Sequence, residues 1–181
     1  GLSIFAGSRA KPSPVVRLFS FLIPKADVPV SLDIDGTKTV HEGAQTDVFS
    51  PDMVARPLAF DAPDLSDAVE VPLVRLAWGR SGDKGNKANI GIIARDAAYL
   101  PHIWAALDED AIRHRFGHFM ADGSGLKRFY LPGSNAMNIL IDEALGGGGV
   151  ASLRNDPQGK AYAQILLDHK ISIPETLAEA L

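Results

Sequence analysis

A polar segment, Arg80-Ser81-Gly82-Asp83-Lys84-Gly85-Asn86, separates two apolar runs of the chain. The run before it is Val71–Trp78 and the run after it is Asn89–Ala94, and both are apolar enough to form strands covered on one or both faces. Glycine and polar residues between two such runs are typical of a connection at the edge of a sheet. The sequence therefore predicts a pair of strands joined by a polar loop.

This predicted loop has the residues of an anion-binding site. Its two glycines would let the backbone turn and present successive N–H groups toward one point. Arg80, Lys84 and Lys87 would add positive charge around that point. We therefore predict that residues 80–86, together with Asn89, bind a ligand. A plain hairpin connection would recruit the same residue types and stays open as the alternative.

Composition places the chain among ordinary globular proteins. It has 181 residues, of which 46% are hydrophobic and 22% charged, enough for one full core and an appendage. The formal net charge is −4 and the basic residues are scattered, so we expect no nucleic-acid partner. The absence of cysteine excludes disulfides, thiolate metal sites and a cysteine nucleophile, and it fits the reducing cytoplasm, where we expect the protein.

The N-terminal part is predicted to be β-rich. One strand is expected over Val15–Ile23, a run that Arg17 and Ser20 interrupt and that is too short to span a bilayer, so we expect no membrane partner. A second strand over Val28–Ile34 would end at an Asp35-Gly36 turn. Residues 1–46 are therefore interpreted as the tail of an upstream domain, and the Pro- and Asp-rich residues 47–70 as a linker.

Residues 71–181 are predicted to form an α/β domain. Broken helical structure is expected over Asp96–Leu107, with Pro101 in a first turn, followed by a helix that Asp108 caps. Ile112, Phe116, Phe119 and Met120 would share one face of that second helix. A short strand is expected over Lys127–Leu131.

The remaining pattern predicts a turn at Pro132-Gly133-Ser134 and a helix that Ser134 caps and Gly146 ends. A last strand over Val150–Leu153 and a helix from Asp156-Pro157 to about His169 would follow. Helical crossovers between strands favour an α+β sandwich, a small mixed sheet covered by helices with right-handed connections.

Three features could converge at one end of that sheet. They are residues 80–89, the turn at 132–135 and the segment 146–154. A helix beginning at Ser134 would offer unpaired N–H groups to a phosphate or carboxylate, and Arg154 could clamp the same group through two parallel hydrogen bonds. Capping and chain reversal would explain Ser134 and the glycines without any ligand, so both readings stay open.

Other chemistry has weaker support. Asp83 and Lys84 could act as acid and base if desolvated, or could be a turn aspartate beside a solvated lysine. Asp110, His114 and His118 have the spacing of one line on a helix and could be metal ligands of a lyase or hydrolase, or an exposed polar stripe. A serine nucleophile needs a nearby base, and Ser81 has no recognisable base near it in the sequence. His41, His102 and His169 have no ligand-spaced partner.

Two longer strings carry a resemblance to a known family. WGRSGDKGNKANIGIIAR (residues 78–95) and GGGGVASLRNDPQGKAYAQILL (residues 146–167) resemble the C-terminal domain of the acyclic terpene utilisation proteins called AtuA. The resemblance covers about residues 71–175 and implies a ferredoxin-like α/β domain. KPSPVVRLFSFLIPK (residues 11–25) is similar to the closing segment of the larger N-terminal region of such proteins.

The resemblance implies a place in the bacterial breakdown of citronellol- and geraniol-type acids, which runs through coenzyme A thioesters. It implies no reaction. We therefore expect a domain without a cofactor that helps bind an acyl-CoA or carboxylate intermediate, with a coenzyme A thioester as the possible ligand. A non-catalytic oligomerisation domain is the alternative. In either case we expect contact with a second copy or with the missing N-terminal region of the family.

Overall fold

The computed structural model describes residues 12, 14–17, 19–41, 49–54, 57 and 60–181. The chain divides into two compact units, one comprising Leu18–Arg56 and the other Gly1–Arg17 with Pro57–Leu181. Each is described by itself.

The described part of the unit Leu18–Arg56 contains one β-hairpin. Strands β1 (Ser31–Ile34) and β2 (Thr37–Val40) pair antiparallel, and short 3-10 helices cover Lys25–Asp27 and Pro51–Met53. The predicted Asp35-Gly36 turn is present, because both residues adopt positive φ (51° and 83°), as the tightest hairpin turns require. The strand predicted over Val15–Ile23 is wrong for the described residues 15–17 and 19–23, which pair with no other strand; Leu18 lies outside the described residues.

The second unit holds six strands and five α-helices in its described part. The strands are β3 (Ala68–Pro72), β4 (Ala77–Lys84), β5 (Lys87–Ala94), β6 (Leu126–Leu131), β7 (Ala136–Ile141) and β8 (Lys170–Pro174). The helices are α1 (Leu73–Leu76), α2 (Leu100–Ala106), α3 (Glu109–Phe116), α4 (Tyr162–Leu167) and α5 (Glu175–Ala178). Short 3-10 helices cover Ala97–Tyr99, Gly117–Phe119 and Pro132–Ser134.

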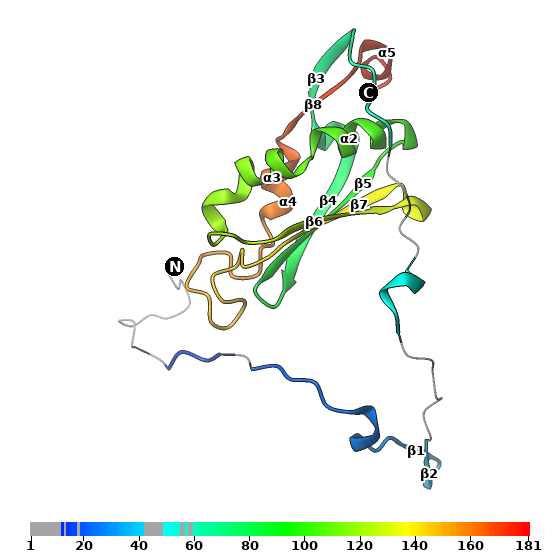
Figure 1. Ribbon diagram of the computed structural model, residues 1–181, viewed down its shortest axis with the longest axis vertical. Helices are drawn as coiled ribbons and strands as arrows, with labels where there is room; N and C mark the ends of the chain where they lie inside the picture. The colour runs from blue at the N-terminus through cyan, green and yellow to red at the C-terminus, as the bar shows by residue number, and fades with distance from the viewer. Residues whose placement is uncertain (1–11, 13, 18, 42–48, 55–56, 58–59) are drawn as a thin grey trace. The chain divides into compact units, whose positions relative to one another are not determined.

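Four of these strands form the main sheet, in the order β4-β5-β7-β6. In Figure 1, α2, α3 and α4 lie on one face of this sheet. The predicted fold class, an α+β fold of the ferredoxin-like type, is confirmed, but every pairing in the sheet is antiparallel rather than mixed. Short turns join β4 to β5 and β6 to β7. The helical crossover from β5 leads to β6, and β7 lies between these two strands and pairs antiparallel with both. Strands β3 and β8 form a separate antiparallel pair.

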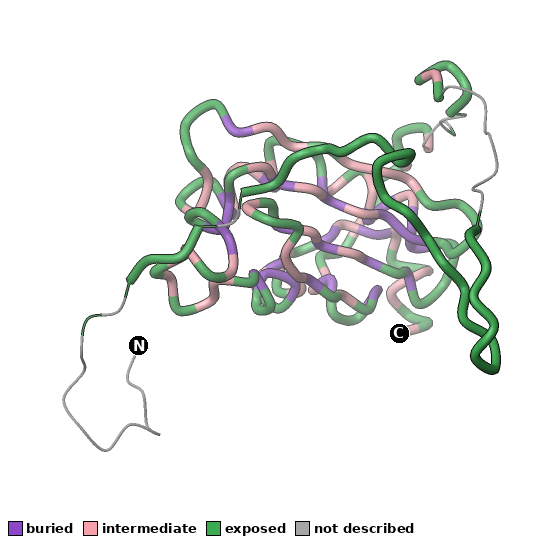
Figure 2. Tube along the Cα trace, turned by 90° about the horizontal axis from the view of Figure 1, so that it is seen from below, coloured by how far each residue is buried: buried purple, intermediate pink, exposed green. Residues whose placement is uncertain are grey.

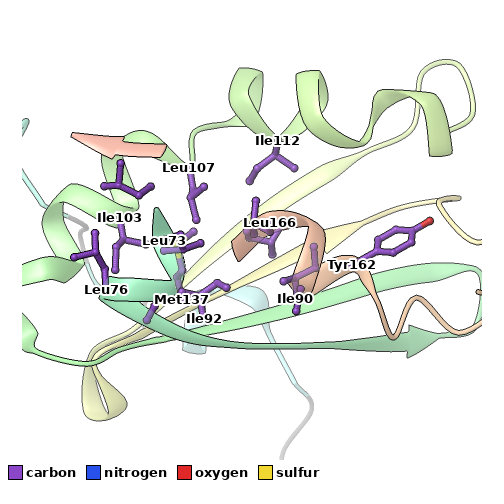
Figure 3. Packing of buried hydrophobic residues seen from close by; sticks show 14 of the residues in the cluster. Leu73, Leu76, Ile90, Ile92, Ile103, Leu107, Ile112, Met137, Tyr162 and Leu166 are labelled. Atoms are coloured by element: carbon purple, nitrogen blue, oxygen red, sulfur yellow. The ribbon is translucent and has the colours of Figure 1, made fainter. Parts of the chain in front are cut away.

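The hydrophobic core lies between the helices and the sheet. Because side chains alternate along a strand, Ile90, Ile92, Met137, Ile139 and Ile141 all point to the helix-covered face and are fully buried. Ile103, Leu107, Ile112 and Leu166 meet them from the helices (Figure 3). Figure 2 shows the resulting alternation of buried and more exposed residues along the strands.

We call the opposite side of the sheet the open face. By the same alternation it carries Trp78, Arg80, Gly82, Lys84, Asn89, Gly91, Ile93, Lys127, Phe129, Leu131, Ala136, Asn138 and Leu140. Three of its apolar residues, Trp78, Ile93 and Leu131, are exposed. The two faces of one sheet therefore differ in polarity and in covering.

The helices before β6 form where the sequence predicts them. The Asp108 carboxylate accepts a hydrogen bond from the N–H of Ala111, 2.8 Å away, and so caps α3. Pro101 lies in the first turn of α2, where its missing N–H costs nothing. The strand predicted over Lys127–Leu131 is β6.

The chain after Pro132 differs from the prediction. The expected helix from Ser134 is the strand β7, and the strand expected over Val150–Leu153 is a turn and coil. Helix α4 begins at Tyr162, later than Asp156-Pro157. The last strand is β8, whose alternating Ile171 and Ile173 are buried. Ala, Met and Leu in 136–141 favour helix locally, but hydrogen bonding to strands on both sides overrides that preference.

Candidate functional site

The polar segment 80–86 is mostly strand and not a loop. Residues 80–84 belong to β4 and pair with β5, from Arg80 opposite Gly91 to Lys84 opposite Lys87. Only Gly85 and Asn86 form the turn, with Gly85 at φ 65°. Consecutive N–H groups of a strand point to opposite sides, so these amides do not converge on one point. The predicted amide cradle is therefore wrong, and any ligand must be held mainly by side chains.

A shallow cavity nevertheless lies along this stretch of β4. Its volume is about 250 Å³. It is lined by six of the predicted residues, Arg80, Ser81, Gly82, Asp83, Lys84 and Asn89, and also by Gly91 and Lys160. We call it the cationic cavity. Gly91 and Lys160 are not among the binding residues that the sequence predicts. Lys160 is distant in the chain, and no local motif marks it.

Two glycines hollow out this part of the open face. Neither Gly82 nor Gly91 has positive φ, so the backbone does not require glycine at either position. A Cβ atom at Gly82 would lie 3.2 Å from Nζ of Lys160, and one at Gly91 would lie 3.8 Å from the carbonyl oxygen of Arg80. Glycine at these positions therefore leaves space beside the side chains of β4, which is a recognised use of glycine inside a strand.

Ser81 holds Lys160 beside the strand. Its Oγ donates a hydrogen bond to the carbonyl oxygen of Lys160 (3.0 Å) and accepts one from the N–H of Ala163 (2.8 Å). The residue is only 6% exposed. Because both bonds engage the start of α4, Ser81 fixes the position of that segment against the edge strand β4. The structure thus gives Ser81 a positioning role at the cavity.

The charge of the cavity is predominantly positive. Arg80, Lys84 and Lys160 are exposed cations, and Asp83 is the one carboxylate among the described residues that line it. Lys84 donates to the carbonyl oxygen of Asp83 at 3.0 Å, and none of the three cations forms an ion pair with another described residue. Asn89 adds an amide, which donates to Oδ1 of Asn138 at 2.9 Å. Such a site can attract a carboxylate or a phosphate group.

The segment after Leu145 packs on the hairpin turn through Gly147 and Gly148. Oδ1 of Asn86 accepts the N–H of Gly147 at 2.7 Å, and the carbonyl oxygen of Asn86 accepts the N–H of Ala144 at 3.1 Å. Gly148 has φ 84°, and a Cβ atom there would lie 2.6 Å from the carbonyl oxygen of Gly85. The predicted meeting of the segments 80–89 and 146–154 is therefore present, and Gly148 serves close packing of backbone on backbone there.

Ser134 lies at the other end of the sheet. The residues before β7 form a 3-10 turn, and Oγ of Ser134 donates to the carbonyl oxygen of Leu131 at 3.4 Å. The next residue, Asn135, adopts positive φ and accepts from the N–H of Ala94, at the end of β5 remote from the hairpin turn. The predicted helix N-terminus is absent because β7 starts here, and Ser134 is no part of the cationic cavity.

Arg154 also lies outside that cavity. Its guanidinium donates to the carbonyl oxygen of Ala144 and lies 5.9 Å from the ring centroid of Phe119. It lines a second cavity, described below, with Phe119 and Tyr162.

The predicted histidine line is broken. Helix α3 ends at Phe116, so His118 falls in the following 3-10 helix. Its ring lies tilted against that of Phe119, with centroids 3.9 Å apart. Asp110 and His114 stay on α3 and are exposed. Among the described residues, no group of three or more His, Cys, Asp or Glu side chains is placed to hold a metal ion.

The pKa values of two other histidines, His102 and His169, are lowered in the fold. Burial lowers the pKa of His102, and a backbone hydrogen bond with Ser172 opposes the shift. Burial and the nearby charge of Arg115 lower the pKa of His169, while a backbone hydrogen bond with Ala106 opposes it. Nδ1 of His102 is buried without a partner among the described residues. Neither histidine lines the cationic cavity, and His41 belongs to the other unit.

Comparison with known proteins identifies the family of this domain. Within the described part of the chain, no helix combines the length and apolar composition that crossing a membrane requires. No curated protein and no solved structure matches the sequence. The model of the AtuA ferredoxin-like domain matches residues 71–172, which is more than half of the chain and covers the cationic cavity. The chain therefore belongs to the AtuA ferredoxin-like domain family.

Proposed function

We propose that this domain binds the anionic part of an acyl-CoA or carboxylate intermediate at the cationic cavity. The domain would complete a site of a longer protein in acyclic terpenoid or branched-acid catabolism. A carboxylate, or the phosphate groups of coenzyme A, would be held by Arg80, Lys84 and Lys160. Asn89 would supply a neutral hydrogen-bonding group. The lack of cysteine supports a cytoplasmic location for this role.

The observation that carries the proposal is the convergence of three cations on one glycine-floored hollow. Arg80 and Lys84 come from β4, whereas Lys160 comes from the segment before α4 and is held there by Ser81. In the described part of the chain these cations have no carboxylate partner within ion-pair distance. Anion binding would therefore compensate charge that the fold leaves unpaired. Membership of the AtuA family supports thioesters as the class of ligand.

The proposal is tested by calorimetric titration of coenzyme A and an acyl-CoA into the parent domain, Arg80→Ala and Lys160→Ala. We expect saturable binding by the parent and a loss of about tenfold to hundredfold in each variant, because a charged hydrogen bond contributes roughly 1.5–3 kcal/mol. Both side chains are exposed, so the melting temperature should stay unchanged.

Lys170→Ala is the matched control. Lys170 is also an exposed lysine of this unit, but it lies on β8 and does not line the cavity. This variant removes the same charge and should bind as the parent does. Equal binding by parent, Arg80→Ala and Lys160→Ala would show that the cavity is not the ligand site.

Self-association is a second candidate function, and the open face favours it. Trp78 is 54% exposed and lies in one cross-strand row with Ile93 and Leu131. A second copy could cover this row. Sedimentation velocity of the parent and of Trp78→Ser tests this candidate. A dimer that dissociates in the variant would support it, and a monomeric parent at all concentrations would exclude it.

A further inference from the structure

A second cavity lies at the start of α4. Its volume is about 460 Å³, which falls within the range of small-molecule sites. The apolar residues that line it are Phe119, Leu153, Ala161, Tyr162 and Ile165. We call it the apolar cavity. None of the functions considered above uses it.

Two of the lining residues, Phe119 and Tyr162, belong to a stack of aromatic rings that the buried Phe116 continues. The ring centroids of Phe119 and Tyr162 are 5.0 Å apart, and those of Tyr162 and Phe116 are 5.3 Å apart. Tyr162 is buried, and its hydroxyl donates to the carbonyl oxygen of Ala144 at 2.7 Å. A wall fixed in this way is preorganised for apolar contact.

The rim of the cavity carries an uncovered leucine and a cation. Leu153 is 94% exposed, so its side chain gains nothing from the fold itself. Arg154 donates to the carbonyl oxygen of Ala144. Burial raises the pKa of the Tyr162 hydroxyl, and the positive charge of Arg154 opposes that rise. The carboxylate of Asp156, which also lines the cavity, accepts the N–H groups of Lys160 (2.9 Å) and Ala161 (2.8 Å).

The two cavities share one short segment of chain. Lys160 lines the cationic cavity, and its neighbours Ala161 and Tyr162 line the apolar cavity. The Asp156 carboxylate and the Ser81 hydroxyl bind this segment from its two sides, through the N–H groups of residues 160 and 161 and the carbonyl oxygen of Lys160. A ligand with a charged part and a hydrocarbon part could therefore meet both kinds of surface at neighbouring residues.

We propose that the apolar cavity binds the hydrocarbon chain of the ligand whose anionic part occupies the cationic cavity. This inference rests on the proposed function and deepens it, because it assigns the ligand a medium-length acyl chain. The aromatic wall and Leu153 would cover the chain.

The test is calorimetric titration of coenzyme A, acetyl-CoA, octanoyl-CoA and decanoate into the parent, Ala161→Trp and Gln164→Trp. Ala161 and Gln164 are both exposed, but only Ala161 lines the apolar cavity, so the first tryptophan fills it and the second is the matched control. We expect affinity of the parent and of Gln164→Trp to rise by about fourfold for each methylene that becomes fully buried. In Ala161→Trp this gain should vanish, while binding of coenzyme A should be unchanged.

Each outcome has a separate meaning for the two proposals. If the parent binds coenzyme A and the octanoyl chain adds no affinity, the proposal for the apolar cavity is overturned and the proposed function stands. The same holds if Ala161→Trp keeps the full gain. Decanoate binding that Ala161→Trp abolishes, in a parent that binds no coenzyme A, supports the apolar cavity and overturns the cationic one as the thioester site. No heat from any of the four ligands overturns both.

Discussion

The two faces of the β4-β5-β7-β6 sheet are built from alternating residues of the same four strands, yet their chemistry is opposite. The helix-covered face carries Ile90, Ile92, Met137, Ile139 and Ile141, all fully buried. The open face carries cations, amides and glycines at the intervening positions of β4 and β5. The comparison teaches that stability is concentrated on one face, which leaves the other free to carry a binding site. Substitutions on the two faces and a pH series test how cleanly stability and binding are separated.

The largest effect on stability is expected at Ile90. Replacement by alanine removes a fully buried side chain and leaves a cavity, which costs about 2–5 kcal/mol. Its neighbour Asn89 points to the open face, so Asn89→Ala should cost only the hydrogen bond to Asn138, about 0.5–1.5 kcal/mol. Urea unfolding measures both. Equal losses of unfolding free energy in Ile90→Ala and Asn89→Ala would contradict the claim that stability is concentrated on the helix-covered face.

Replacing Ser81 is expected to lower the free energy of unfolding by less than replacing Ile90 does. It should also weaken anion binding. Ser81→Ala leaves the N–H of Ala163 and the carbonyl oxygen of Lys160 without their partner, a loss of about 1–3 kcal/mol. Because Ser81 also positions Lys160, anion binding should weaken. Urea unfolding and calorimetric titration report the two effects. Ser81→Cys, which keeps the volume, is the control for packing. If Ser81→Ala is destabilised but binds the anion as the parent does, Ser81 does not position Lys160 for binding.

Acid should destabilise the unit through the helix-covered side. The pKa values of His102 and His169 are lowered below 6.5 in the fold, so the unfolded chain binds more protons between each folded pKa and 6.5. Stability from these residues is complete above about pH 6.5 and is lost as pH falls through the folded pKa values. Melting temperatures from pH 5 to 8 measure this, and His102→Gln with His169→Gln should flatten the acid side of the curve. An unchanged acid side in that double variant would show that other groups control it.

The smallest effect is expected at the ion pair of Lys87 and Asp142. Nζ and Oδ1 are 2.7 Å apart, but the lysine is about half exposed. Solvent-exposed pairs contribute roughly 0–1 kcal/mol, and salt screens them. Lys87→Ala should therefore change the free energy of unfolding by less than about 1 kcal/mol, and less still in high salt. A larger loss that salt does not reduce would assign Lys87 a packing role.

Much of the fold follows from local signals in the sequence. Asp108 and Pro101 mark the starts of α3 and α2, and the Asp35-Gly36 turn marks the first hairpin. These features depend on neighbouring residues alone, which is why they can be predicted. The alternation of Ile171 and Ile173 before Pro174 was an available signal for β8 that the prediction did not use.

The sequence-based predictions are wrong where contacts between distant parts of the chain determine the local structure. Residues 136–141 favour helix by composition, and only pairing with β5 and β6 makes them a strand. Residues 80–84 have turn composition, and only the ladder with β5 makes them a strand. Residue types in the sequence predicted six of the residues that line the cationic cavity, but not Gly91 or Lys160. Ser81 and Lys160 are 79 residues apart in the chain, and no local pattern encodes such a contact.

Gly91 offers the most direct test of the central claim, that the open face binds an anion in a hollow that glycine leaves. Its backbone suits any residue, and a Cβ atom there meets only ordinary contacts, so Gly91→Val should fold with a melting temperature equal to or above that of the parent. Titration of coenzyme A into this variant should show binding lost or strongly weakened, because the valine side chain fills the floor of the cationic cavity. Affinity equal to that of the parent would contradict the account.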